Sequence, residues 1–153
     1  MTWRTQTLRC KGYAEDEKRM VESQWQLHGQ LAADCHYLGK GEAAHLLLHR
    51  NASLHWLILV PETGVLDLLD LPAAQRNALM DQAAGVANYL KNDLGYPRVN
   101  VGALGLVVPQ LHLHVVGRRE LDPCWPAPVW GNLAAEAGYT ESAVTELAQA
   151  LLN

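Results

Sequence analysis

Gln110, His112 and His114 are the residues whose types and spacing most clearly suggest chemistry, because single apolar residues separate them. Successive side chains of a β-strand point to opposite faces, so a strand here would place two imidazoles and an amide in one row. A neutral histidine is a nucleophile near neutral pH and can also orient phosphate oxygens. The pattern predicts a histidine-based phosphate site, while a solvent-facing polar row fits the same alternation equally well.

The histidine pair could instead hold a metal ion, since two histidines in a His-x-His sequence can both bind zinc. No third ligand with a recognisable spacing accompanies them. Four further candidates are spread over two predicted strands without ligand spacing, namely Asp34, His36, His45 and His49. We expect these four to be surface or hydrogen-bonded positions, and we predict a site without a metal or cofactor. A metal-binding protein stays open as an alternative.

The charge balance argues against a nucleic-acid partner. The chain has 153 residues and a formal net charge of −4, and its few Lys and Arg residues are scattered. Binding to a nucleic-acid backbone needs a basic patch, whereas one or two local donors suffice for a small nucleotide. The expected partner is therefore a small-molecule nucleotide.

The composition suits a globular protein with a filled core, because 49% of the residues are hydrophobic and 18% are charged. The longest apolar stretches, such as residues 54–60, are too short to cross a bilayer, and no apolar signal region follows the N-terminus. Three widely spaced cysteines fit reduced thiols better than disulfides, namely Cys10, Cys35 and Cys124. We expect a cytoplasmic protein with no membrane partner.

The hydrophobic pattern predicts an α+β domain in which an antiparallel sheet packs against helices. Apolar content and turn residues predict five strands, at residues 31–37, 45–49, 54–60, 98–104 and 111–117. Leu79, Ala83, Val86 and Leu90 recur at helical spacing and predict a helix over residues 72–94. Thr140 is the expected cap of a second helix at the C-terminal end of the chain.

Residues 1–22 differ from the rest of the chain. Their run of mixed charge at residues 15–19 has no clear apolar face. We expect residues 1–22 to be an extension that is dispensable for folding, and residues 23–153 to form the domain.

Residues 110–116 resemble the signature of the histidine triad family, in which three histidines alternate with apolar residues, and Gln110 stands where the first histidine would be. Residues 57–61 look like the family's strand that ends in proline. Asn100, followed by a glycine-containing turn, is similar to its nucleotide-binding segment. Residues 122–131 resemble the tail of a bacterial branch that also carries glutamine at the first position.

This resemblance implies a HIT-like fold with a five-stranded antiparallel sheet and two main helices, and usually a homodimer. It also implies hydrolysis or transfer at the α-phosphorus of a nucleoside phosphoramidate or a dinucleoside polyphosphate, through a nucleotidyl-histidine intermediate. His112 stands in the place of the nucleophile. His114 matches the histidine that hydrogen-bonds the phosphate or leaving group and takes part in proton transfer. Gln110 can make a hydrogen bond but cannot take a proton near neutral pH.

Three further residues are candidates for substrate binding. Asn51 stands where the resemblance implies a ribose ligand, although turn chemistry alone would explain an asparagine there. Asn100 has the same ambiguity, but asparagine is less expected on a strand. Gly105 would offer backbone donors to the phosphate.

Several departures from the family pattern bear on activity. Trp56 stands where the family often has a histidine, and the neighbouring His55 would point to the opposite face of its strand. Leu106 and Val107 replace polar residues that commonly hold phosphate oxygens. These changes predict weaker phosphate binding and slow turnover. They also keep open a second interpretation, a non-catalytic nucleotide-binding or regulatory module with the same fold.

Overall fold

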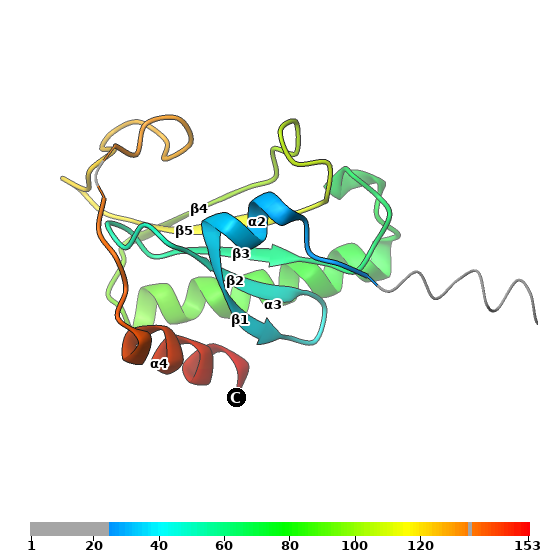
Figure 1. Ribbon diagram of the computed structural model, residues 1–153, viewed down its shortest axis with the longest axis horizontal. Helices are drawn as coiled ribbons and strands as arrows, with labels where there is room; N and C mark the ends of the chain where they lie inside the picture. Colours follow the sequence, from blue (N-terminus) through cyan, green and yellow to red (C-terminus); the bar gives the residue numbers. More distant parts are fainter. Residues whose placement is uncertain (1–24, 135) are drawn as a thin grey trace, which may run out of the picture.

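The computed structural model describes residues 25–134 and 136–153, so the predicted extension at residues 1–22 lies outside the described residues. A five-stranded antiparallel sheet forms the centre of the molecule, with helices on both faces (Figure 1). The described elements are α2 Gly29–Asp34, β1 Cys35–Lys40, β2 His45–His49, β3 Trp56–Val60, the 3-10 helix η1 Leu68–Asp70, α3 Ala73–Asn92, β4 Arg98–Gly102, β5 Leu113–Arg118 and α4 Glu141–Leu152. The predicted α+β class is confirmed.

The strand order places β5 inside the sheet. The order is β1-β2-β3-β5-β4, so β5 pairs with β3 on one side and with β4 on the other. In this register, His114 lies opposite Ile58 of β3 and opposite Gly102 of β4. A residue flanked by two paired strands has little backbone freedom, and the sheet therefore fixes the position of His114.

One face of the sheet, the lower face in Figure 1, is covered by α3 and α4. Alternate residues of the strands, among them Leu57, Leu59 and Val115, are buried there. They pack against the helix residues Leu79, Ala83, Val86, Leu90 and Leu147. This is the apolar stripe predicted for residues 72–94, and burial of such stripes provides most of a helix's stability in a folded protein.

The opposite face carries a second, mostly apolar cluster and the histidine pair. Trp56, Ile58 and Val116 project from the strands, and Leu31 of α2 packs with them. Figure 1 shows α2, the loop after β4 and the loop after β5 on this side. Every residue of β3 is buried, as expected for a strand covered on both faces.

The strand predicted at residues 31–37 is wrong in its first half, because α2 occupies Gly29–Asp34 and β1 begins only at Cys35. The side chain of His28 accepts a hydrogen bond from the backbone N–H of Gln30 and caps this helix. Leu31 is the one buried residue of α2, so a single apolar side chain docks this helix. The predicted strand at residues 111–117 also begins later, at Leu113.

The two main helices agree with the sequence. The helix predicted over residues 72–94 is α3, whose first residue follows Pro72. The hydroxyl of Thr140 accepts a hydrogen bond from the backbone N–H of Ala143 and caps α4. Within the described residues, no helix has both the length and the apolar character needed to span a membrane.

Candidate active site

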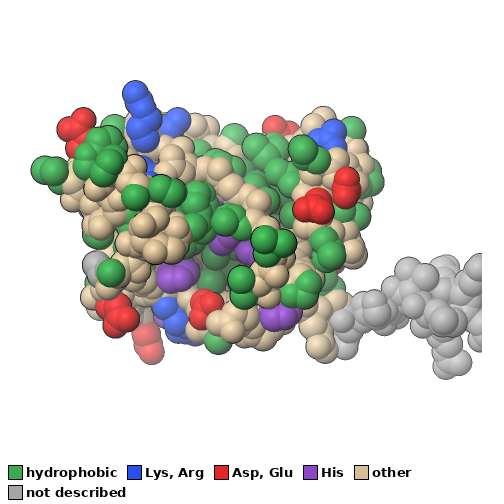
Figure 2. Space-filling model, turned by 90° about the horizontal axis from the view of Figure 1, so that it is seen from above, with side chains coloured by type: hydrophobic (Ala, Val, Ile, Leu, Met, Phe, Trp, Pro, Cys, Tyr) green, Lys and Arg blue, Asp and Glu red, His purple; other side chains and the backbone are tan. Residues whose placement is uncertain are grey.

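The two histidines lie together on the sheet face that is not covered by α3. The ring centroids of His112 and His114 are 4.9 Å apart and the ring planes are nearly perpendicular, at 84°. Each residue exposes only 7% of its surface. Figure 2 shows histidine side chains in a hollow bordered by hydrophobic groups on this side of the molecule. The structure thus brings the predicted pair together.

His112 is oriented by the backbone rather than by a side chain. Its Nδ1 lies 2.6 Å from the backbone carbonyl oxygen of Gln110. A carbonyl oxygen can only accept, so Nδ1 must carry the proton that it shares. In the neutral ring the other nitrogen, Nε2, then has a free lone pair, which is the form that acts as a nucleophile.

His114 has the opposite tautomer. The indole Nε1–H of Trp56 donates to its Nδ1 at 2.9 Å, so in the neutral ring Nε2 carries the hydrogen. Burial, followed by the neighbouring His112 and His49, lowers the pKa of His114 to about 3. A ring that is neutral at physiological pH has no imidazolium proton to give. The proton-transfer role expected from the resemblance does not suit this environment, whereas hydrogen-bond donation from Nε2 does.

Aromatic rings enclose this pair on the β3 side. His49 stacks on Trp56, with centroids 4.6 Å apart and planes at 13°. Trp130 meets His114 edge-on at 5.6 Å, and a side chain on Gly102 would come within 3.0 Å of the same indole. Trp56 thus supports His114 through the hydrogen bond from its indole N–H. The sequence identifies Trp56 only as a position where the family often has a histidine. His55 bonds Tyr96 instead.

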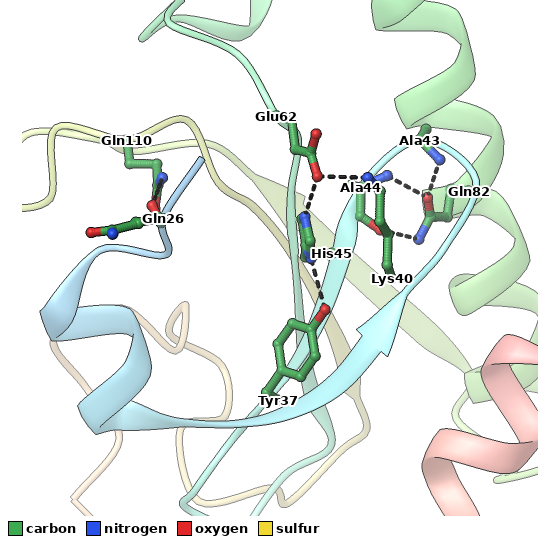
Figure 3. A network of polar contacts seen from close by, with 9 residues as sticks. All are labelled: Gln26, Tyr37, Lys40, Ala43, Ala44, His45, Glu62, Gln82 and Gln110. Carbon is green, nitrogen blue, oxygen red and sulfur yellow. Dashed lines mark hydrogen bonds and ion pairs between the residues drawn. The ribbon is translucent and has the colours of Figure 1, made fainter. Parts of the chain in front are cut away.

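Gln110 is not part of the reactive row that the alternation predicted. Gln110 and His112 precede β5, which begins at Leu113. Strand geometry therefore does not hold the side chains of Gln110, His112 and His114 on one face. The Gln110 carboxamide is turned towards the segment before α2 (Figure 3). Its Oε1 accepts from the backbone N–H of His28 at 2.9 Å, and its Nε2 donates to the carbonyl of Gln26 at 3.0 Å. The sequence carried no signal for these contacts, which span more than 80 residues.

A pocket of about 500 Å³ adjoins His112. Gly105 lines it with a φ of +71°, a conformation that favours glycine. Leu106 and Val107, at the tip of the same loop, are 99% and 90% exposed. The backbone N–H groups of these three residues donate no hydrogen bond to another described residue. The remaining lining residues are Leu66, Asp67, Leu68, Leu69, Asp70, Ala103, Leu104 and Leu111.

A second pocket, of about 520 Å³, lies beside His49. It is lined by Ala33, Asp34, Arg50, Asn51 and residues 136–138. The Oδ1 of Asn51 accepts from the backbone N–H of Ser53, so the asparagine closes the turn that its position predicted. The structure therefore places Asn51 in a pocket that His49 lines and the histidine pair does not.

Asn100 belongs to a separate arrangement at the other end of β5. Its Oδ1 accepts from Arg118, whose guanidinium also forms two bonds with the buried carboxylate of Asp122. Burial alone would raise the pKa of Asp122, but hydrogen bonds from Arg118 and from backbone N–H groups outweigh it and hold this pKa below its usual value. Asn100 therefore supports this ion pair, which lies four residues along β5 from His114.

The remaining histidines do not assemble a metal site. Within residues 25–134 and 136–153, no group of three or more His, Cys, Asp and Glu side chains is placed to hold an ion. His45 lies between Tyr37 and Glu62, as Figure 3 shows, while His36 meets Arg50. Each is a satisfied polar position, as the sequence predicted for them.

Comparison with known proteins identifies the relatives of this chain. The HIT domain family model matches residues 30–121. A histidine triad protein from Marinobacter aquaeolei is 37% identical, with a TM-score of 0.76, covering 84% of this chain and 96% of that one. One from Sinorhizobium meliloti is 32% identical, with a TM-score of 0.77, covering 84% and 95%. One from Bradyrhizobium japonicum is 34% identical, with a TM-score of 0.76, covering 83% and 95%. No curated protein matched.

Proposed function

The chain belongs to the histidine triad family, and from this we propose that it hydrolyses or transfers a nucleotidyl group, with His112 as the nucleophile at the α-phosphorus. One observation carries the proposal. The carbonyl of Gln110 holds Nδ1 of His112 at 2.6 Å, which leaves Nε2 as the nitrogen with a lone pair beside an open pocket. His114 cannot take this role, because Trp56 fixes its tautomer the other way.

The proposed reaction has two steps. In the first, the Nε2 lone pair of His112 bonds to the α-phosphorus, and the phosphorus–leaving-group bond breaks with its electrons moving to the leaving group. A departing amine takes its proton from solvent. In the second, a water oxygen bonds to phosphorus and the phosphorus–nitrogen bond breaks, which returns the electron pair to Nε2 and releases a nucleoside monophosphate and a proton. A different acceptor in the second step makes the reaction a transfer.

The phosphate would be held by neutral donors. His114 offers its Nε2–H, which stays in place at neutral pH because the ring does not titrate there. The loop that contains Gly105, Leu106 and Val107 offers backbone N–H groups without a partner in the described residues. Preorganised donors of this kind stabilise the charge that develops on phosphate oxygens in the transition state. We propose Gly105 and His114 as the phosphate contacts.

The pocket at His112 favours a phosphoramidate over a dinucleoside polyphosphate. Asp67 and Asp70 both line it, and among the described residues no Lys or Arg does. Further phosphates placed there would meet two carboxylates with no cation to offset the repulsion. An amine leaving group brings no further negative charge to this pocket, where most of the other lining side chains are apolar.

We propose that the nucleoside uses the pocket beside His49, where Asn51 and Arg50 supply polar groups. We also propose a homodimer, which the resemblance implies, and a cytoplasmic location, which the apolar pattern and the cysteines predict. Light scattering checks the first, because a dimer has twice the mass of the 16.9 kDa chain.

A non-catalytic nucleotide-binding module is the second candidate. It is favoured by the two apolar side chains of Leu106 and Val107, which point into solvent and provide no polar contact to a phosphate. The two candidates share a fold and differ only in turnover.

Release of AMP from adenosine 5′-phosphoramidate separates them, with diadenosine polyphosphate measured in parallel. We expect turnover of the phosphoramidate, little turnover of the polyphosphate, and no turnover by the His112→Ala variant. A thermal shift with AMP that is not accompanied by AMP release from either compound would establish the binding module. Faster cleavage of the polyphosphate would contradict the leaving-group assignment.

A further inference from the structure

Residues 25–28, which we term the N-terminal strap, lie across the sheet face that carries the histidine pair. Trp25 stacks flat on His45, with centroids 3.9 Å apart and planes at 4°. His45 is itself held between Tyr37 and Glu62, at 2.8 Å and 2.9 Å. Leu27 packs against the apolar cluster of this face. One end of the strap is thus fixed on the ring of His45, whose own hydrogen bonds are drawn in Figure 3.

The other end of the strap is fixed by Gln110. The carboxamide has one carbonyl and one NH2 group, and it uses both on strap backbone, the N–H of His28 and the carbonyl of Gln26. A neutral amide makes these two bonds at any physiological pH because it does not titrate. The strap and the loop before β5 are thereby joined at two points.

The same residue orients the proposed nucleophile. The backbone carbonyl of Gln110 accepts from Nδ1 of His112, so its side chain holds the strap while its main chain holds the imidazole. Residues 103–110 are irregular and form no backbone–backbone hydrogen bond with another described loop or turn. Burial of Val108 and Leu111 anchors the segment on either side of Gln110, and the two side-chain bonds are the hydrogen bonds that hold Gln110 itself.

We propose that the N-terminal strap is a positioning element of the active site, which acts on the tautomer and orientation of His112 through Gln110. The catalytic consequence rests on the proposed function, whereas the effect on His112 does not. Loss of the strap contacts would let the Gln110 carbonyl turn, and His112 would then populate the tautomer that carries hydrogen on Nε2. That form has no lone pair at the attacking nitrogen.

The strap contact can be removed without changing Gln110. His28→Pro deletes the N–H that Gln110 accepts, and the φ of −57° at this position is one that proline adopts. The matched control is His28→Ala, which keeps this N–H. Both variants lose the imidazole that caps α2, so a difference between them reports the backbone contact.

Two readouts are measured on the full chain and both variants. Nitrogen-15 NMR of the imidazoles gives the His112 tautomer without any substrate, and steady-state kinetics with adenosine 5′-phosphoramidate gives kcat and KM. We expect a single Nδ1–H tautomer in the parent and in His28→Ala, and a mixture in His28→Pro. We also expect kcat of His28→Pro to fall about 10-fold or more below that of His28→Ala, with KM changed less, since misplacing a catalytic group by ~1 Å can cost ~10²-fold.

The outcomes separate the two proposals. A tautomer mixture in His28→Pro without turnover in any variant would support the strap and refute the proposed function. Normal turnover with the same tautomer in the proline and alanine variants, at matched melting temperatures, would refute the strap. Gln110→Ala removes both strap contacts and must then show the same tautomer mixture if His28→Pro does; an unchanged tautomer in Gln110→Ala would also refute it.

Discussion

The two ends of β5 both carry buried polar side chains, but different kinds of hydrogen bond hold them. At the C-terminal end, Arg118 and Asp122 form a charged pair in which the side chains are 7% and 0% exposed. At the N-terminal end, His112 and His114 are each 7% exposed, and each ring is oriented by an uncharged donor or acceptor. Both ends bury polar groups, and both satisfy them with hydrogen bonds, as burial requires.

The difference lies in what is left unsatisfied. The carboxylate of Asp122 accepts from Arg118, from Arg119 N–H and from Cys124 N–H, so this end is saturated. Each imidazole at the other end has one nitrogen fixed, and no hydrogen bond within the described residues engages the other nitrogen. At the C-terminal end of β5, the bonds to Asp122 hold the loop that follows the strand. At the N-terminal end, His112 keeps one lone pair and His114 keeps one N–H, and both are available to a ligand.

The largest expected effect is on the saturated end. Asp122→Ala leaves the buried Arg118 without its carboxylate, which costs about 3–5 kcal/mol for a buried ion pair broken at one partner. Urea unfolding of the variant measures the loss. The double variant Arg118→Met, Asp122→Leu is the control, and it should lose less than Asp122→Ala. Equal losses would show that the pair is not coupled as described.

Acid should weaken the histidine end first. The pKa of His114 is about 3 in the folded chain, against 6.5 for an unperturbed histidine. Between these two pH values, protons bind the unfolded chain in preference to the folded chain. The contribution of a neutral His114 to the free energy of unfolding is therefore fully present above pH 6.5, and it falls as the pH decreases towards 3. His114 alone should cost about 2 kcal/mol at pH 5 relative to pH 8. Burial also lowers the pKa of His49 and His55, which adds to the loss.

Melting temperatures of the parent and of His114→Gln across pH 5–8 test this expectation. Glutamine keeps hydrogen-bonding capacity but does not titrate, so the variant should lose less stability in acid than the parent does. Parallel pH profiles for the two proteins would place the acid sensitivity elsewhere.

A smaller effect is expected at the support of His114. Trp56→Phe keeps an aromatic ring under His49 but removes the N–H that fixes His114 Nδ1. Turnover should fall about 10-fold, equivalent to about 1.4 kcal/mol, because the donor to the phosphate is then present in only part of the molecules. Trp56→His restores a ring N–H and should recover part of the rate. Unchanged kcat in Trp56→Phe would remove Trp56 from the site.

Much of the fold was predictable because its signals are local. The stripe of Leu79, Ala83, Val86 and Leu90 identifies α3, and the apolar runs identify the sheet. α2 was missed because six residues are too few to show a helical period, and this helix depends on the cap from His28 and the docking of Leu31.

The histidine pair was predictable from its alternation and its resemblance to a family, but the surroundings of the pair were not. The contacts of Gln110 with Gln26 and His28 join residues that are 84 and 82 positions apart, and no periodicity reports such a contact. The donation from Trp56 to His114 likewise depends on the register of β3 with β5. The tautomer of His114 therefore depends on a tertiary contact, whereas that of His112 is set by the carbonyl of Gln110, two residues before it.

We propose that His112 alone carries the nucleotidyl group. The most direct test is to mix the protein with an activated nucleotide, quench without acid, and locate the adduct by intact-mass and peptide mass spectrometry. We expect one nucleotidyl group on His112, no adduct in His112→Ala, and a slower but detectable adduct in His114→Ala. An adduct on His114, or undiminished turnover by His112→Ala, would contradict it.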